Sequence, residues 1–286
     1  VRALRRAPAA MTRDRKVAAF RALHAGEMFV MPNVWDAGGA QLFAGLGFPA
    51  LATTSAGYAI ATGRRDGRGE VDRDDALAHA GALVRATDLP VTADLENGYG
   101  DAPEAVAETV IRAAEAGLAG ISIEDVRPDR AAPVYDRDAA VARIEAAVGA
   151  AREVGIVLTA RADGMLARAY AFDEAVTRLQ AFEAVGAEVL YAPGVPGLVK
   201  LKALCAAVGR PVNHVIGLGA AGASRDELAA AGVARVSLGG SLARLAYGAL
   251  FEAGRAMGEG RFDLAEAGAG WGEILAAMKA GRPEAP

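Results

Sequence analysis

A regular alternation of short apolar runs with longer alanine-rich segments is the feature that most constrains the fold of this chain. Each apolar run has the length of a buried strand, and the segment after it places its apolar residues on one helix face. Strands that alternate with helices form a parallel sheet, because the helix returns the chain to the starting edge before the next strand. The expected strands are 29–32, 50–53, 91–93, 120–123, 157–160, 189–192, 211–216 and 235–238.

The number of strands and the chain length favour a closed barrel. Eight strands and 286 residues lie close to the eight strands and roughly 250 residues of a (β/α)8 barrel. Gly117, Gly186 and Gly232 each stand just before an expected strand, where a left-handed residue ends the preceding helix. The expected helices are 74–86, 103–116, 138–154, 173–185, 199–208, 224–231 and 242–255. We therefore predict an α/β fold, a single (β/α)8 TIM barrel over residues 17–286.

Two terminal segments fall outside a minimal barrel. Residues 1–16 carry six basic side chains but lack the continuous apolar run of a signal peptide, so we expect a flexible basic leader. Residues 271–280 are amphipathic and predict an extra C-terminal helix. This helix could pack on its own barrel, or it could be swapped with a neighbouring subunit and tie a dimer together.

Composition excludes several classes of function. The net charge of -4 gives no overall attraction to nucleic acid or to an anionic membrane, so a small molecule is the expected partner. The single cysteine, Cys205, rules out an internal disulfide and a zinc site built from several thiolates. No apolar stretch approaches the roughly 18 residues of a membrane span. We expect a cytoplasmic protein.

Acidic residues end two neighbouring strands at the edge where barrels of this class place their active sites. Asp94 and Glu96 are two residues apart, so in extended backbone both carboxylates point to the same side. Glu124 ends the next strand, roughly 5 Å across the sheet. Oxygen ligands without thiolates favour a hard ion, Mg²⁺, with Mn²⁺ as a substitute. The alternative is that these acids cap helices or pair with arginines.

Arg161 ends the fifth strand and is the candidate anchor for an anionic substrate. A guanidinium group can hold a carboxylate through two parallel hydrogen bonds. The alternative is a structural ion pair with Glu124 or Asp163. We favour the substrate role, because so acidic an edge would otherwise repel an anionic ligand.

The second and seventh strands add polar candidates at the same edge. Thr54, Ser55 and Ala56 are small, so backbone N–H groups there can approach an oxyanion closely, although an ordinary turn has the same composition. Among the three histidines only His214 is expected at this edge, beside Asn213. His214 is therefore a candidate acid or base, and Asn213 a candidate substrate ligand.

Together these motifs resemble the phosphoenolpyruvate mutase and isocitrate lyase superfamily over residues 29 to 251. Residues 94–100, Asp-Leu-Glu-Asn-Gly-Tyr-Gly, are similar to its Asp-Ala-Asp-x-Gly-(Tyr/Phe)-Gly metal motif, with glutamate for the second aspartate. Residues 120–125 resemble the strand end whose glutamate binds the metal through water. Residues 159–163 resemble the segment whose arginine binds the substrate carboxylate.

Two further matches extend the resemblance. Residues 54–56 fall where the family holds an oxyanion on a serine-glycine turn, and Asp66 matches its Gly-x-x-Asp, which adds Asp66 to the implied metal ligands. Members of this family bind magnesium and form the enolate of pyruvate or a related acid. The resemblance therefore implies an enzyme, a carbon–carbon lyase.

The loop at residues 126–136 departs from the family pattern. It reads Val-Arg-Pro-Asp-Arg-Ala-Ala-Pro-Val-Tyr-Asp, where lyases carry Lys-Lys-Cys-Gly-His and mutases carry Lys-x-Asn-Ser. Tyr135, Asp129 and His214 are then the candidate proton donors.

The surviving residues predict a Mg²⁺-dependent lyase that cleaves a C–C bond of a small 2-oxo or 2-hydroxy di- or tricarboxylate, by retro-aldol cleavage or decarboxylation. One alternative is P–C chemistry, a mutase or hydrolase acting on a phosphonopyruvate-like acid. The other is a catalytically inactive barrel that only binds a ligand. We expect a homodimer or homotetramer.

Overall fold

A computed structural model describes residues 11–128, 133–217, 222–262 and 268–283. Nine parallel strands form one nearly closed sheet in the order β1-β9-β8-β7-β6-β5-β4-β3-β2. Their bounds are β1 (Phe29–Met31), β2 (Asn33–Val34), β3 (Leu51–Thr53), β4 (Val91–Asp94), β5 (Gly120–Glu124), β6 (Val157–Arg161), β7 (Val189–Tyr191), β8 (Val212–Val215) and β9 (Val233–Ser237).

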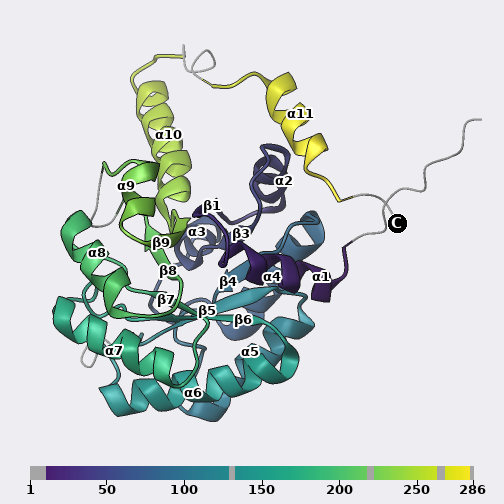
Figure 1. The fold of residues 1–286 in the computed structure, drawn as a ribbon. Coiled ribbons are helices and arrows are strands. Elements are labelled where there is room, and N and C mark those ends of the chain that lie inside the picture. The colour runs from purple at the N-terminus through teal and green to yellow at the C-terminus, as the bar shows by residue number, and fades with distance from the viewer. Residues whose placement is uncertain (1–10, 129–132, 218–221, 263–267, 284–286) are drawn as a thin grey trace, which may run out of the picture.

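The nine strands occupy the eight positions that were predicted. Pro32 has no backbone N–H and divides the first expected strand into β1, which pairs with β9, and β2, which pairs with β3. The two halves thereby join the ends of the sheet and close the barrel. The predicted (β/α)8 TIM barrel is confirmed, and Figure 1 shows α5 to α8 around the outside of the strands.

Helices connect the strands largely as the periodicity predicted. Their bounds are α1 (Arg13–Leu23), α2 (Ala37–Gly45), α3 (Ser55–Ala61), α4 (Arg73–Ala86), α5 (Pro103–Glu115), α6 (Arg137–Val154), α7 (Phe172–Ala184), α8 (Gly197–Ala207), α9 (Arg225–Ala230), α10 (Ser241–Gly258) and α11 (Trp271–Ala280). The sequence analysis missed α2 and α3. Helix α2 contains three glycines, which lower helix propensity, and α3 has only seven residues.

The expected boundary of the basic leader at residue 16 is wrong. Helix α1 begins at Arg13, and the hydroxyl of Thr12 caps it by accepting from the backbone N–H of Arg15. Lys16 is buried, and its ammonium group donates a 2.8 Å hydrogen bond to the carbonyl of Thr87. The basic residues at 2, 5 and 6 lie outside the described part of the chain.

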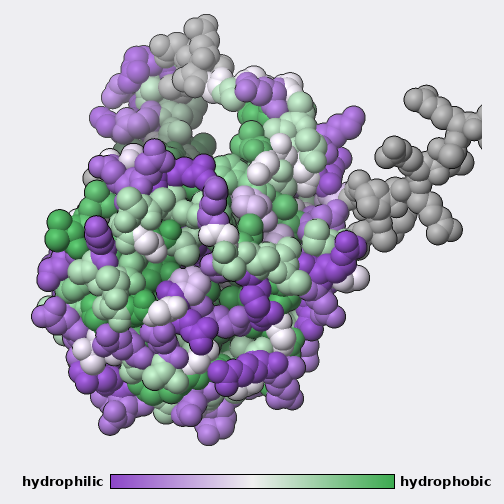
Figure 2. Space-filling model, viewed as in Figure 1, coloured by the Kyte–Doolittle hydropathy of each residue, from purple (hydrophilic) through white to green (hydrophobic). Residues whose placement is uncertain are grey.

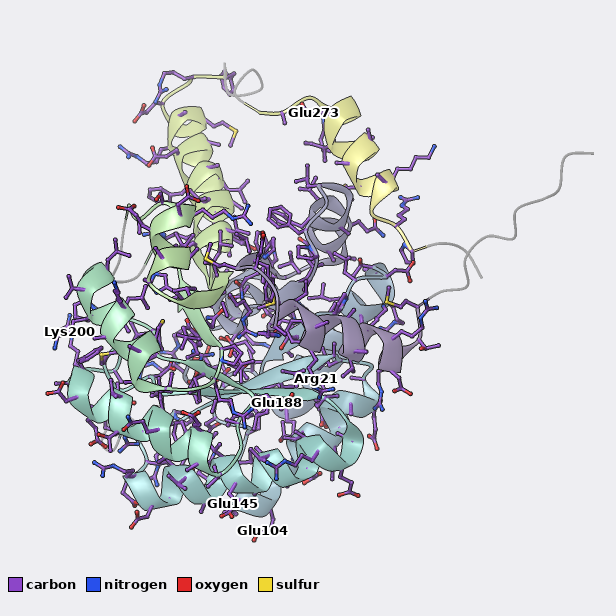
Figure 3. All side chains as sticks on the ribbon, in the orientation of Figure 1. Arg21, Glu104, Glu145, Glu188, Lys200 and Glu273 are labelled. Atoms are coloured by element: carbon purple, nitrogen blue, oxygen red, sulfur yellow. The ribbon has the colours of Figure 1, made fainter. Side chains whose placement is uncertain are left out.

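Helix α1 covers the barrel at the end opposite the expected active site. Phe20 is fully buried and packs edge-on against the ring of His24. Arg21 forms a 2.7 Å ion pair with Glu188, which precedes β7, and Figure 3 labels both side chains. The apolar residues of α1 were visible in the sequence, but their burial depends on strands far away along the chain.

The predicted extra C-terminal helix is present as α11 and packs on α2 of its own chain. The two helices approach very closely, because a Cβ on Gly45 would overlap the carbonyl oxygen of Ala277. Figure 1 shows α10 and α11 extending away from the barrel. Of the two arrangements considered for this helix, the structure places it against its own subunit.

The outer surface is mainly hydrophilic around the lower rim, where Figure 2 shows polar residues over α5, α6 and α7. By contrast, α10 exposes large apolar side chains, with Leu245 at 68% and Phe251 at 65% of their full accessibility. Within the described residues, no helix is both long and apolar enough to cross a membrane.

Candidate active site

Arg161 is the centre of the site, and three carboxylates surround it. Its guanidinium nitrogens lie 2.7 Å from Asp94 Oδ1, 2.9 Å from Glu124 Oε2 and 2.7 Å from Asp163 Oδ2. Parallel pairing of β5 with β6 sets Glu124 directly opposite Arg161. All four side chains are less than one fifth exposed. The predicted residues from β4, β5 and β6 therefore meet at one point.

Glu96 and Asp66 add two more carboxylates to this group. Burial, followed by repulsion from Asp94 and Asp66, raises the pKa of Glu96 to about 8. Burial and then the Asp94 charge raise the pKa of Asp66 as well, although hydrogen bonds from Ser55 and Gly67 oppose the change. Both shifts favour the protonated carboxyl group, first because burial removes water and second because neighbouring carboxylates repel a further negative charge.

We call Asp66, Asp94, Glu96, Glu124 and Asp163 the acidic cluster. One guanidinium group faces five carboxylates, so the cluster suits an additional cation, and its oxygen donors suit a hard divalent ion. Within the described residues no three His, Cys, Asp or Glu side chains are already grouped to hold an ion. Asp94 and Glu124 instead bind Arg161, which is the structural pairing that the sequence left open.

The segment after β3 is the start of a helix. Thr54 caps α3, and its hydroxyl accepts a 3.2 Å hydrogen bond from the backbone N–H of Gly57. The hydroxyl of Ser55 donates to Asp94 Oδ2 over 3.0 Å, and Ala56 lies in the first turn. The backbone N–H groups of Gly57 and Ser55 therefore both have acceptors, Thr54 and Asp94 respectively.

Asn213 lies inside the barrel and is fully engaged. Its Oδ1 accepts a 2.8 Å hydrogen bond from Arg235 Nε, and its Nδ2 donates over 2.9 Å to the hydroxyl of Ser237. His214 follows it in β8, so its side chain points to the opposite face of the strand, toward the helices. Burial lowers the pKa of His214, and the structure does not bring it to the acidic cluster.

Tyr135 also lies away from the cluster. Its hydroxyl donates a 2.5 Å hydrogen bond to Asp101 and accepts one of 2.9 Å from Asn97. Its ring lies between the guanidinium groups of Arg127 and Arg143, at 4.2 and 4.0 Å. These contacts give Tyr135 a structural role beneath the loop that follows β4. Asp129, the other candidate in the loop after β5, lies outside the described residues.

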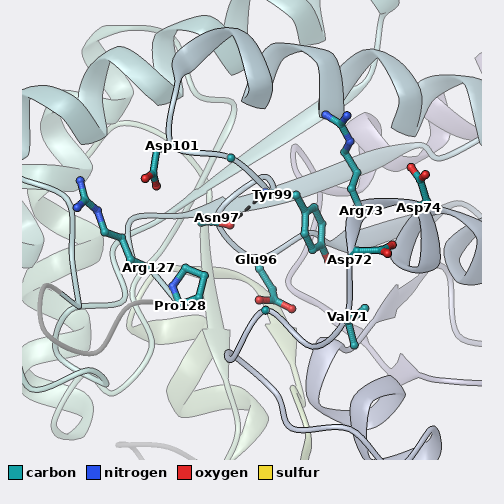
Figure 4. Close-up of a pocket in the computed structure, with 12 residues that line it drawn as sticks. Val71, Asp72, Arg73, Asp74, Glu96, Asn97, Tyr99, Asp101, Arg127 and Pro128 are labelled. Atoms are coloured by element: carbon teal, nitrogen blue, oxygen red, sulfur yellow. Dashed lines mark hydrogen bonds between the residues drawn. The ribbon is translucent and has the colours of Figure 1, made fainter.

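Two residues near the site were not recognised from the sequence as candidates. Tyr99 belongs to the segment that resembles the metal motif but had no predicted role, and it lies beside Glu96 (Figure 4). Arg235 has the same inward alternation as Ser237 in β9, a signal that could have revealed it. Arg235 donates to Asn213 and Thr159 inside the barrel.

Two neighbouring cavities open at this edge of the barrel. The mouth cavity, of about 420 Å³, is lined by Ser55 and Arg161 together with four members of the acidic cluster. The outer cavity, of about 730 Å³, is lined by Val71, Tyr99 and Pro128 among others, and is drawn in Figure 4. Glu96 and Arg127 line both, so the two spaces adjoin each other.

The chain is similar in sequence to several known proteins. The family model for phosphoenolpyruvate phosphomutase matches residues 20–257. The uncharacterized protein MT2054 of Mycobacterium tuberculosis is 32% identical over 83% of this chain and 87% of its own length. The 2,3-dimethylmalate lyase of Eubacterium barkeri is 30% identical over 62% of each chain, and an oxaloacetate decarboxylase of Rhodopseudomonas palustris is 29% identical over 70% of each.

Solved structures show the same fold. A Burkholderia cenocepacia J2315 protein described only as a lyase/mutase is 49% identical, with a TM-score of 0.88 over 92% of this chain and 95% of its own. A 2,3-dimethylmalate lyase of the PEP mutase/isocitrate lyase superfamily is 27% identical, with a TM-score of 0.79 over 92% of this chain and 94% of its own. The predicted resemblance to this superfamily is confirmed, as is the prediction of a lyase-type enzyme family.

Proposed function

Because the chain belongs to the phosphoenolpyruvate phosphomutase family, we propose that it is a Mg²⁺-dependent lyase that cleaves a C–C bond of a small 2-oxo or 2-hydroxy di- or tricarboxylate through an enolate. One observation carries the proposal: three carboxylates bind a single arginine at the carboxyl ends of β4, β5 and β6, and the charges of Glu96 and Asp66 lie close enough to interact with them. That arrangement combines a cation site with an anion anchor in one cavity.

The acidic cluster supplies the oxygen donors for a metal. Asp94, Glu96, Glu124 and Asp66 are the residues that would hold Mg²⁺, with Mn²⁺ as a substitute. When bound, the ion would polarise the carboxylate and the 2-oxygen of the substrate, so that negative charge moving onto the C2–C3 unit is stabilised. The family is generally dependent on divalent metals, which supports this assignment.

Arg161 is proposed to anchor the substrate carboxylate. Its guanidinium group already holds one carboxylate through two hydrogen bonds, with Asp163 accepting from Nε at 3.2 Å and from Nη2 at 2.7 Å. A substrate carboxylate would take the place of Asp94 or Glu124 in that geometry, once a cation draws those side chains away. After the exchange Arg161 would still have a carboxylate partner in place of the one it loses.

The start of α3 is proposed to hold the opposite side of the same anion. The backbone N–H of Ser55 points toward Asp94, 3.4 Å from Oδ2, and the hydroxyl of Ser55 donates to the same oxygen. These donors face the position where a 2-oxo acid would lie beside Asp94. Fixed donors of this kind stabilise charge that develops on an oxygen during turnover.

Relatives bear on the choice between carbon–carbon and phosphorus–carbon chemistry. The curated relatives of known activity include 2,3-dimethylmalate lyase, 2-methylisocitrate lyase and oxaloacetate decarboxylase, all C–C lyases or decarboxylases. A second candidate, P–C chemistry on a phosphonopyruvate-like acid, is favoured by 36% identity to a Burkholderia cenocepacia structure described as a phosphonomutase. We rank it second, because residues 126–128, Val-Arg-Pro, differ from the Lys-x-Asn-Ser of mutases.

Product analysis separates these reactions. The protein is incubated with Mg²⁺ and, in separate reactions, oxaloacetate, 2,3-dimethylmalate, 2-methylisocitrate, isocitrate, citramalate and phosphonopyruvate, and pyruvate, glyoxylate and phosphate are followed. We expect pyruvate or glyoxylate without phosphate, and Glu96→Ala should abolish the reaction. Phosphate release from phosphonopyruvate, or its conversion into phosphoenolpyruvate, would move the assignment to P–C chemistry. Binding of oxalate with Mg²⁺ but no turnover would identify a barrel that only binds its ligand.

The setting of the reaction is also a proposal. We infer a homodimer or homotetramer, because α10 carries exposed apolar side chains that a second copy would cover. We propose the cytoplasm as its compartment, since a chain with the single cysteine Cys205 carries no internal disulfide of the kind found in oxidising compartments.

A further inference from the structure

The turn that follows β4 has a backbone conformation that L-amino acids seldom adopt. Glu96 has a φ of 47° and Tyr99 a φ of 58°, with Gly98 at 82° between them. For a bulky aromatic residue such a value is an outlier, and outliers of this kind gather at functional sites. Here the turn carries a predicted metal ligand at one position and a phenol at the other.

Several contacts hold this turn rigid. Asn97 Oδ1 accepts a 3.1 Å hydrogen bond from the backbone N–H of Tyr99, and Asn97 Nδ2 donates to Tyr135 over 2.9 Å. Arg143 donates from below to the carbonyls of Asn97 and Gly100. The Tyr99 side chain is therefore presented by a fixed scaffold, and its direction does not depend on a mobile loop.

The phenol of Tyr99 lies next to the acidic cluster. Its ring lines the outer cavity beside Glu96, and Figure 4 shows the two side chains together. The Tyr99 hydroxyl forms no hydrogen bond with the described residues, and it is not one of the buried polar atoms that lack a partner, so it is accessible from the cavity.

The other candidate donors are occupied elsewhere. Tyr135 donates to Asp101, and His214 points toward the helix layer. Tyr99 is thus a phenol on the outer cavity, beside Glu96, whose hydroxyl has no partner among the described residues. We propose that Tyr99 is a further catalytic residue, whose hydroxyl donates a hydrogen bond to the substrate oxygen on which negative charge develops. This inference rests on the proposed lyase function.

The test removes one oxygen atom. The metal motif that this turn resembles accepts tyrosine or phenylalanine, so Tyr99→Phe keeps the ring and its packing while removing only the donor. Tyr247→Phe on α10 is the matched control, because Tyr247 lines neither cavity. We would measure kcat and KM on the acid that the wild-type protein turns over, together with Mg²⁺ affinity by calorimetry without substrate.

We expect Tyr99→Phe to lower kcat about 100-fold, as loss of one oxyanion donor does, with Mg²⁺ affinity within about threefold of wild type and Tyr247→Phe unchanged. A kcat within threefold of wild type would overturn the proposal for Tyr99 and leave the lyase function standing. An equal loss of Mg²⁺ affinity and kcat would also overturn it, by assigning Tyr99 to the support of the cluster. Absence of turnover in the wild-type protein would instead refute the lyase function.

Discussion

Replacing Glu96 by glutamine should stabilise the metal-free protein and remove its stabilisation by Mg²⁺. Glu96 is 9% exposed, and its pKa is raised from 4.5 to about 8. A carboxyl group with a raised pKa binds its proton more tightly in the folded state, so stability falls as pH rises from 4.5 to 8. At pH 7 the wild-type protein has lost stability over about 2.5 pH units, at about 1.4 kcal/mol per unit. Glu96→Gln avoids this loss, so its free energy of unfolding should be up to about 3 kcal/mol higher.

Addition of Mg²⁺ should remove most of the stability advantage of Glu96→Gln over the wild-type protein. At 100 times its Kd, a bound ion stabilises the wild-type protein by about 2.7 kcal/mol, which for a chain of this size raises Tm by about 5 to 10 °C. If loss of one charged ligand weakens binding about 100-fold, the same concentration stabilises Glu96→Gln by only about 0.4 kcal/mol. The neutral side chain therefore helps the metal-free fold and harms the metal complex.

Guanidinium unfolding at pH 7, with EDTA or with Mg²⁺, measures both effects. Glu104→Gln on the exposed face of α5 is the control, and Figure 3 shows that side chain at the outer rim. Glu104→Gln should change neither the stability of the metal-free protein nor its stabilisation by Mg²⁺ by more than about 0.5 kcal/mol. The reasoning is refuted if Glu96→Gln destabilises the metal-free protein, or if Mg²⁺ stabilises it as much as the wild type.

Three further predictions concern the anchor, the base of the barrel and the outer surface. Arg161→Lys should lower kcat/KM at least about 100-fold, because an ammonium group cannot make the two parallel hydrogen bonds of a guanidinium, and steady-state kinetics showing less than a tenfold loss would contradict the anchor role. His24 accepts from Arg235 at 3.1 Å, and burial and then that charge lower its pKa to about 3. In the unfolded chain His24 protonates near pH 6.5, so lowering the pH from 6.5 to 5 should reduce the free energy of unfolding of the wild-type protein by up to about 2 kcal/mol more than that of His24→Gln. Equal reductions for the two proteins in denaturant unfolding would exclude this. Replacing Leu250 and Phe251, both 65% exposed on α10, by serine should shift the protein toward monomer in light scattering, whereas an unchanged mass would place the subunit contact elsewhere.

Local patterns were sufficient to predict the barrel and the central residues of the site. Apolar runs separated by amphipathic segments leave few alternatives to parallel strands with helices outside, because both elements must bury one face. Once the strand ends are known, parallel pairing brings those ends to one edge. Asp94, Glu124 and Arg161 therefore meet for reasons already contained in the order of the sequence.

The roles of several polar residues depended on contacts that no local pattern contains. Asn213 and His214 are adjacent and both polar, and only the pairing of β8 with β9 decides that Asn213 faces the interior. Tyr135 lies in the loop that was expected to carry a proton donor. Val126 pairs with Val134 and folds this loop back, so the phenol of Tyr135 reaches Asp101.

The sequence by itself determined the periodic architecture and the positions of the strand ends, since these follow from spacing along the chain. Tertiary structure alone decided which side chains are free to act. Arg161 is held by three acids from three segments, and Tyr99 is turned beside Glu96 by a left-handed backbone that Asn97 supports. Hydrogen-bond partners are set by packing between distant segments, and this packing leaves the Tyr99 donor unused while Tyr135 is engaged.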